Sequence, residues 1–190
     1  MARISMIERE SMTDDQRAAC DEAASGLRGA VPTPMIAWIR NAELARRAQR
    51  LGELLRYQTE LAPRLSELAI IVCARHWTSH VEWTAHKREG LKAGLDPDVV
   101  ASIAAGRRPE FKSSDEALVY DIASALLARG RIEPALYETA RLELDERRLV
   151  ELVALVGYYS LVALTLNAFE LGLPEKFASE LAEIPELGSL

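Results

Sequence analysis

The sequence of residues 64–95 reads RLSELAIIVCARHWTSHVEWTAHKREGLKAGL. Apolar residues recur three and four positions apart from Leu65 to Cys73, a spacing that is typical of a mostly buried helix. A second helix start is predicted at Ser79, because Ser79 and Glu82 have the spacing of a capping box. We therefore expect two helices joined near Trp77.

Helix start and stop signals recur along the rest of the chain, and little in it is typical of strands. Residues 13–16 have the spacing of a capping box, and Gly26 stands where the first helix should end. Further helix starts are predicted at Asn41, Asp96, Ser113, Ile132 and Asp145, the last helix ending near residues 171–174. Residues 113–116 have the spacing of another capping box, and the helix expected from Ile132 to Leu142 has Pro134 in its first turn. The pattern predicts a single all-α domain of about seven or eight helices over residues 1–190, without internal repeats.

The composition limits the classes of protein to which the chain can belong. It has 190 residues, 49% of them hydrophobic, which is enough for one substantial core. With a net charge of -6 and basic residues interspersed among acids, it is not expected to bind nucleic acid. The first fifteen residues lack the apolar segment of a signal peptide, and Cys20 and Cys73 have no disulfide or zinc spacing, so we expect a cytoplasmic protein.

Residues 152–169 form the most apolar stretch, at the lower length limit for a membrane span. The stretch contains Ser160 and Asn167 and is bounded by Glu151 and Glu170. A helix that is apolar nearly all round can instead be buried in a core or at a subunit interface. We therefore expect no membrane insertion, and a homo-oligomer whose interface includes part of this helix or of the helix that begins near residue 64.

The junction between the two helices of the opening stretch is open to four interpretations. Ser79 and Glu82 could do no more than cap a helix. His76 and His80 could bind a metal together with His86 or Glu82, although a break between the helices would separate them. Glu82 or another carboxylate could orient His86 for proton transfer. Ser79 could be a nucleophile with His86 as its base, although no oxyanion motif accompanies it.

Three segments, residues 44–57, 64–100 and 144–172, resemble the carboxymuconolactone decarboxylase and alkylhydroperoxidase-like superfamily. The most specific element is the E-W-x-x-H that ends at His86, and the similarity extends over about 38–173. The resemblance implies an alkylhydroperoxidase-like helical fold and oligomeric association. It also implies a site formed by a glutamate of the first core helix and the start of the next helix.

Matching positions give Glu67 and His86 the places of the glutamate and histidine of that site. Ser79 and Glu82 stand where the peroxidase branch of the superfamily has its Cys-x-x-Cys pair, so the redox pair is absent. Glu67 precedes Glu82 by about 22 Å along an unbroken helix. It can therefore join the site only if the chain folds back near Trp77.

The decarboxylase branch of the superfamily needs no thiol. Loss of carbon dioxide requires a group that anchors a carboxylate and an acid that protonates the resulting carbanion. The expected catalytic residues are His86, Glu82, Glu67 and Ser79, and the expected substrate-binding residues are Arg75, Trp77, Trp83 and His80, with no metal and no cofactor. We therefore expect a non-redox, cofactor-independent enzyme that acts on a small organic acid or lactone. A peroxiredoxin- or alkylhydroperoxidase-type antioxidant and a catalytically inactive oligomeric binding protein remain the alternatives.

Overall fold

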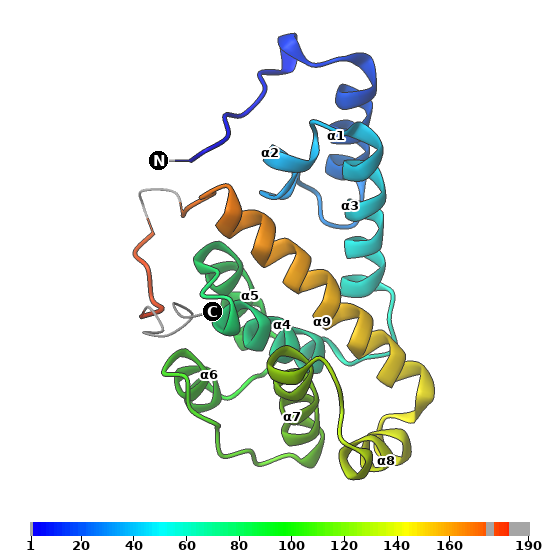
Figure 1. Ribbon diagram of the computed structural model, residues 1–190, viewed down its shortest axis with the longest axis vertical. Helices are drawn as coiled ribbons and strands as arrows, with labels where there is room; N and C mark the ends of the chain where they lie inside the picture. The colour runs from blue at the N-terminus through cyan, green and yellow to red at the C-terminus, as the bar shows by residue number, and fades with distance from the viewer. Residues whose placement is uncertain (1, 174–176, 183–190) are drawn as a thin grey trace.

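The computed structural model of the protein describes residues 2–173 and 177–182, and all regular secondary structure within them is helical (Figure 1). The elements are a 3-10 turn, η1 (Arg9–Ser11), and the helices α1 (Asp14–Ser25), α2 (Met35–Trp38), α3 (Ala42–Tyr57), α4 (Pro63–His76), α5 (His80–Lys92), α6 (Pro97–Ala104), α7 (Ser114–Arg129), α8 (Pro134–Glu143) and α9 (Asp145–Ala168). Within these ranges no strand occurs, which confirms the all-α prediction. Of the nine α-helices found there, α2 is a single turn of four residues, and the other eight agree with the expected number.

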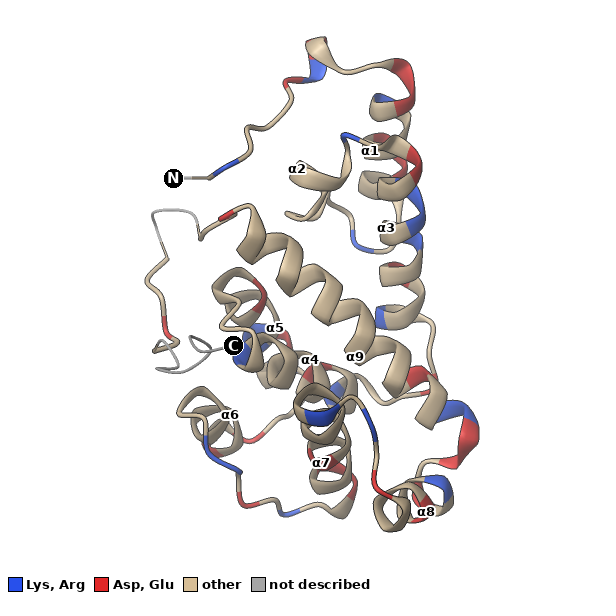
Figure 2. Cartoon of the chain, viewed as in Figure 1, with Lys and Arg blue, Asp and Glu red and all other residues tan. Residues whose placement is uncertain are grey.

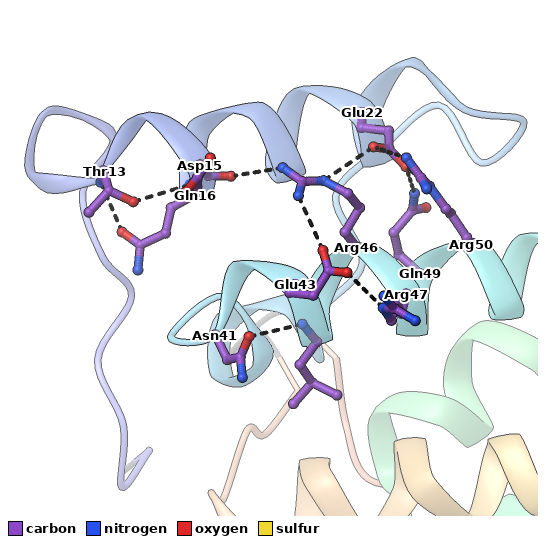
Figure 3. A network of polar contacts seen from close by, with 11 residues as sticks. Thr13, Asp15, Gln16, Glu22, Asn41, Glu43, Arg46, Arg47, Gln49 and Arg50 are labelled. Carbon is purple, nitrogen blue, oxygen red and sulfur yellow. Dashed lines mark hydrogen bonds and ion pairs between the residues drawn. The ribbon is translucent and has the colours of Figure 1, made fainter.

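Several helices begin at the caps that the sequence predicts. The Thr13 hydroxyl accepts a hydrogen bond from Gln16 N at 3.3 Å, and Gln16 Oε1 accepts one from Thr13 N at 3.0 Å, so the capping box of α1 is complete (Figure 3). Asn41 Oδ1 accepts from Leu44 N at 3.0 Å at the start of α3 (Figure 3). Asp96 caps α6 in the same manner. These side chains satisfy backbone donors that the helix itself leaves free.

The capping box predicted at Ser113 and Glu116 is wrong. Asp115 Oδ1 accepts from Glu116 N at 2.7 Å, and the Ser113 hydroxyl donates to the same carboxylate. The Glu116 side chain is instead buried against Arg64 of α4, which also donates to Asp115 Oδ2 at 2.9 Å. A charge-assisted contact between helices has replaced the weaker local cap.

Helix α4 lies at the centre of the molecule. All of its residues from 65 to 75 are buried, and it packs against α5, α7 and α9. Figure 1 shows α9 crossing the molecule obliquely. Helices α1 and α3 lie along one side of it in the upper half of the view, and α7 and α8 lie at the bottom. Because α4 is surrounded by other helices, the side chains it carries are held by packing on several sides.

Helix α9 carries no charged residue after Glu151 (Figure 2). Among the described helices it alone is long and apolar enough to cross a membrane, yet 56% of its most apolar window is buried inside the molecule. Leu155 and Tyr159 belong to the core, whereas Val150 and Leu164 on the outer face are exposed. The inner face of α9 is buried, as in a core helix. Part of its outer face is exposed in the single chain.

The end of α9 comes earlier than predicted. The helix stops at Ala168, and Glu170 adopts a left-handed conformation with φ 49°. Leu171 N then donates to Leu166 O at 2.9 Å, which closes the helix end. The reversal thus occurs before Gly172, and residue 174 of the predicted end lies outside the described residues.

Candidate active site

A sharp turn after α4 folds the chain back on itself. Ser79 N donates to Ala74 O at 2.8 Å, and Thr78 adopts a left-handed conformation with φ 48°. A β-branched residue rarely adopts this conformation, which costs roughly 1–3 kcal/mol. Asn167 of α9 donates to Trp77 O at 2.6 Å and helps to hold the turn. The reversal lays α5 along α4, so that residues of both helices can meet.

Glu67 of α4 and His86 of α5 meet in the protein interior. Glu67 Oε2 lies 2.6 Å from His86 Nδ1, and each residue is only 6% exposed. Arg56 of α3 donates from Nε to Glu67 Oε1 at 3.4 Å. The guanidinium group can only donate, so Glu67 accepts from Arg56 as a carboxylate. A carboxylate can only accept from His86 as well, so His86 Nδ1 carries the hydrogen. The second ring nitrogen of His86, Nε2, therefore holds the lone pair of the neutral ring.

The protein environment keeps His86 uncharged at neutral pH. Burial lowers the pKa of His86, and the neighbouring Arg56 and Arg28 lower it further. Glu67 acts in the opposite direction, both through its charge and through its hydrogen bond, but burial dominates. His86 is thus a neutral imidazole with an oriented ring, which is the form required of a general base.

Glu82 is the second buried acid of the site. It is 3% exposed, and neither carboxyl oxygen has a hydrogen-bond partner among the described residues. Burial raises the pKa of Glu82 well above its ordinary value of 4.5. The hydroxyl of Ser79, which is fully buried, opposes this rise. The predicted capping box does not form, because the Ser79 hydroxyl caps no backbone N–H and Ser79 N donates to Ala74 O rather than to Glu82. Burial therefore favours the protonated, uncharged form of Glu82 over the carboxylate.

Glu82 and His86 line the same cavity, which has a volume of about 160 Å³. Its lining consists of Arg28, Pro32, Thr33 and Pro34 from the loop before α2, Arg56 from α3, Val81, Glu82, Ala85 and His86 from α5, and Tyr158, Tyr159, Val162 and Leu166 from α9. Arg28 Nη2 and the Tyr159 hydroxyl are also buried without a hydrogen-bond partner in the described chain. For comparison, an apolar cavity of about 150 Å³ holds a benzene molecule. The cavity is large enough for a small organic molecule, and several unpaired polar groups face it.

Two tyrosines of α9 form an aromatic wall of the cavity. The rings of Tyr158 and Tyr159 are nearly perpendicular, with centroids 5.3 Å apart, and the His86 ring lies edge-on to Tyr159 at 4.9 Å. The Tyr158 hydroxyl fits against Gly52 of α3, where an added Cβ would lie only 2.1 Å from the hydroxyl oxygen. Gly52 is thus needed for the close approach of α3 to this wall.

The expected site residues fall into two groups. His86, Glu82 and Glu67 come together, with Ser79 buried beside Glu82. The expected substrate-binding residues do not line the cavity. Arg75 donates to Ala182 O at 3.0 Å, Trp77 donates to Ser160 Oγ at 3.2 Å, and His80 Nδ1 lies 2.8 Å from Ser179 Oγ. Trp83 is 1% exposed and belongs to the core, and Trp77, Ser79 and His80 border a separate pocket of about 340 Å³ at the end of α9.

The two arginines and two tyrosines of the cavity were not among the site residues expected from the sequence. Arg28 lies in a loop outside the region of superfamily resemblance, and nothing near it in the sequence indicates a site. Arg56 stands one helical turn after Gly52, on the side of α3 that faces the core. Tyr158 and Tyr159 are polar aromatics within an otherwise apolar run, and this is the one signal that could have marked them.

The three histidines do not form a shared metal site. Within residues 2–173 and 177–182, no group of three or more His, Cys, Asp or Glu side chains is arranged to hold a metal ion. His76 lines a different pocket, beside Arg75, and burial lowers its pKa. No protein-family model and no curated protein matches the chain. The superfamily resemblance therefore rests on its motif residues alone.

Proposed function

We propose that the protein is a cofactor-independent acid–base enzyme, a lyase similar to carboxymuconolactone decarboxylase, that acts on a small organic acid or lactone. The observation that carries the proposal is the presence of two groups with oppositely shifted pKa values in one cavity. Glu67 orients His86 as a base, and burial favours the protonated acid form of Glu82. Neighbouring cavity groups whose pKa values are both shifted by their surroundings are typical of functional sites.

The proposed reaction is a decarboxylation. The bond between the carboxylate carbon and the substrate carbon breaks, its electron pair passes into the conjugated lactone or carbonyl system, and carbon dioxide leaves. Glu82 donates its proton to the carbon that has lost the carboxylate. This leaves Glu82 as a buried carboxylate, which its surroundings disfavour.

His86 restores the acid after each turnover. It stands one helical turn after Glu82 on α5, so the two side chains project from the same face. His86 first takes up a proton from solvent at Nε2 and becomes an imidazolium ion, which then transfers that proton to the Glu82 carboxylate and returns to the neutral ring. Glu67 stabilises the imidazolium ion during this exchange, because its carboxylate lies 2.6 Å from Nδ1.

The thiols of the chain do not support the dithiol alternative. Both cysteines are free and buried, Cys20 on α1 and Cys73 on α4. Burial raises the pKa of both thiols and leaves them poor nucleophiles. Acid–base chemistry uses the groups that face the cavity, whereas peroxide reduction would need thiols that do not line it.

The test is a kinetic comparison against a panel of small lactone acids, followed by release of carbon dioxide. Glu82→Gln and His86→Gln should each lower kcat by about 10²–10⁴-fold, the usual contribution of a positioned proton-transfer group. His76→Gln is the matched control, because His76 is a partly buried histidine outside the cavity, and it should leave kcat unchanged. Turnover that survives both cavity substitutions would refute the proposal. Absence of turnover over the whole panel would favour the binding-protein alternative.

A further inference from the structure

Arg28 brings a positively charged group with one unpaired nitrogen to the cavity, from outside the region of superfamily resemblance. It lies in the loop between α1 and α2, and its side chain lines the cavity with Glu82 and His86. The Nη2 atom is buried and has no hydrogen-bond partner among the described residues. A buried guanidinium nitrogen without a partner is costly, which indicates that a ligand or water completes it.

The loop that carries Arg28 is held in place by α3. Leu27 N donates to Glu53 Oε2 at 3.0 Å, directly beside Arg28. An added Cβ at Gly26 would lie 2.1 Å from that same oxygen, so a larger residue there would displace the Glu53 carboxylate. Arg28 is thus placed through the backbone of its own loop.

Helix α1, which leads into this loop, is fastened to α3 by a polar network (Figure 3). Glu22 of α1 accepts from Gln49 Nε2 at 2.9 Å and from Arg50 Nη2 at 2.8 Å. Gln49 is only 6% exposed, so this anchor is partly shielded from water. Helix α1 is therefore anchored to α3 just before the loop that carries Arg28.

The charges around the cavity favour one negative charge on the ligand. Of the two arginines in the lining, Arg56 already pairs with Glu67. Among the described residues, Arg28 has only the neutral Tyr158 hydroxyl as a side-chain partner and keeps an unpaired nitrogen at Nη2. Burial favours the uncharged forms of Glu82 and His86. One positive charge is therefore left to be balanced from within the cavity.

We infer that Arg28 anchors the single carboxylate of a substrate with a flat, unsaturated or aromatic body of about the size of benzoate. The guanidinium fork matches a carboxylate in shape and charge. The aromatic wall of Tyr158 and Tyr159 and the volume of about 160 Å³ suit a flat body of that size. This inference rests on the cavity being the reaction site proposed above, and it assigns substrate selection to the N-terminal segment.

The test uses benzoate and its uncharged analogue benzamide as probes, with binding measured by titration calorimetry on the full chain. The wild type should bind benzoate more tightly than benzamide. Arg28→Gln should weaken benzoate binding by at least about tenfold, the usual worth of a hydrogen bond to a charged group, and should barely change benzamide binding. Arg28→Lys, which keeps the charge, should recover part of the affinity. Arg129→Gln, on an exposed arginine, is the control and should bind like the wild type.

Two results would overturn the inference. The first is that the wild type does not bind benzoate, or binds it no more tightly than Arg28→Gln does. The second is that the wild type binds benzamide and benzoate with equal affinity. The same titrations separate this inference from the proposed function. Glu82→Gln and His86→Gln should still bind benzoate, so Arg28-dependent binding without any turnover would leave the anchor standing and reject the enzyme. Turnover that depends on His86, with an unchanged KM in Arg28→Gln, would support the proposed enzyme and reject Arg28 as the anchor.

Discussion

Replacement of Glu82 by glutamine should change how the stability of the protein depends on pH. Burial raises the pKa of Glu82 in the folded chain well above 4.5, the value expected when the chain unfolds. Between these two pKa values the folded state holds a proton that the unfolded state has lost. The free energy of unfolding therefore falls as pH rises. The stabilising contribution of the neutral acid is fully present below pH 4.5 and is lost as pH rises toward the folded pKa.

The magnitude follows from linkage. One proton of difference changes the free energy of unfolding by about 1.4 kcal/mol per pH unit. From pH 5 to pH 7 the wild type should lose about 3 kcal/mol through Glu82, for as long as the folded carboxyl stays protonated. Glutamine does not titrate, so the free energy of unfolding of Glu82→Gln should not fall in this way. Relative to the wild type, Glu82→Gln should therefore become more stable by the same amount between pH 5 and pH 7.

Urea denaturation at several pH values between 5 and 7 measures the difference between the two proteins. Groups shared by both proteins contribute equally and cancel in the comparison. Glu89→Gln on the same helix is the matched control. Its hydrogen bond with Lys92 lowers the pKa of Glu89, so it should not reproduce the gain with rising pH. A difference between wild type and Glu82→Gln that stays constant from pH 5 to pH 7 would show that Glu82 is not a neutral buried acid.

The remaining predictions concern packing, redox chemistry and assembly. Gly52→Ala should destabilise the protein by about 1–3 kcal/mol in urea denaturation, because its Cβ would meet the Tyr158 hydroxyl. Gly157→Ala, in open space on α9, should instead stabilise it by up to about 1 kcal/mol, and equal effects of the two substitutions would contradict this account. The wild type should not reduce hydrogen peroxide with a dithiol, since Cys20 and Cys73 are free and buried; turnover that is lost in the double serine variant would reverse that conclusion. Light scattering should return a mass above the 21.0 kDa of one chain, because the outer face of α9 is apolar and uncovered, and a monomer at micromolar concentration would disprove this.

The helices were predictable because their start signals are local. Thr13 and Asn41 bind backbone donors within three residues, so their effect does not depend on the rest of the fold. The same logic failed at Ser113, where Arg64 from another helix draws the glutamate away. Local rules hold where no distant partner competes for the same side chain.

The candidate site was predictable only in part. The break near Trp77 was expected from a capping box at Ser79, and the chain does reverse there. The reversal, however, depends on the left-handed Thr78, while Glu82 points into the cavity and caps nothing. Arg28 could not be found, because its position depends on contacts between α1 and α3 that have no short-range signature. Sequence proximity likewise favoured Arg75 as the anchor, although its side chain reaches Ala182.

The fold-back at Thr78 also bears on the order in which the site can be assembled. Glu67 and His86 are 19 residues apart and lie in one helical hairpin, so their contact closes a short loop. Contacts between distant parts of the chain, such as the hydrogen bond from Trp38 to Thr165 across 127 residues, form after this hairpin during folding. The cavity walls from α3 and α9 are therefore completed after Glu67 and His86 have met. Brief opening of the loop around Arg28 would then admit solvent or ligand while the hairpin stays intact. Amide hydrogen exchange should accordingly be fast in residues 26–34 and slow in α4, and a bound ligand should slow the loop alone.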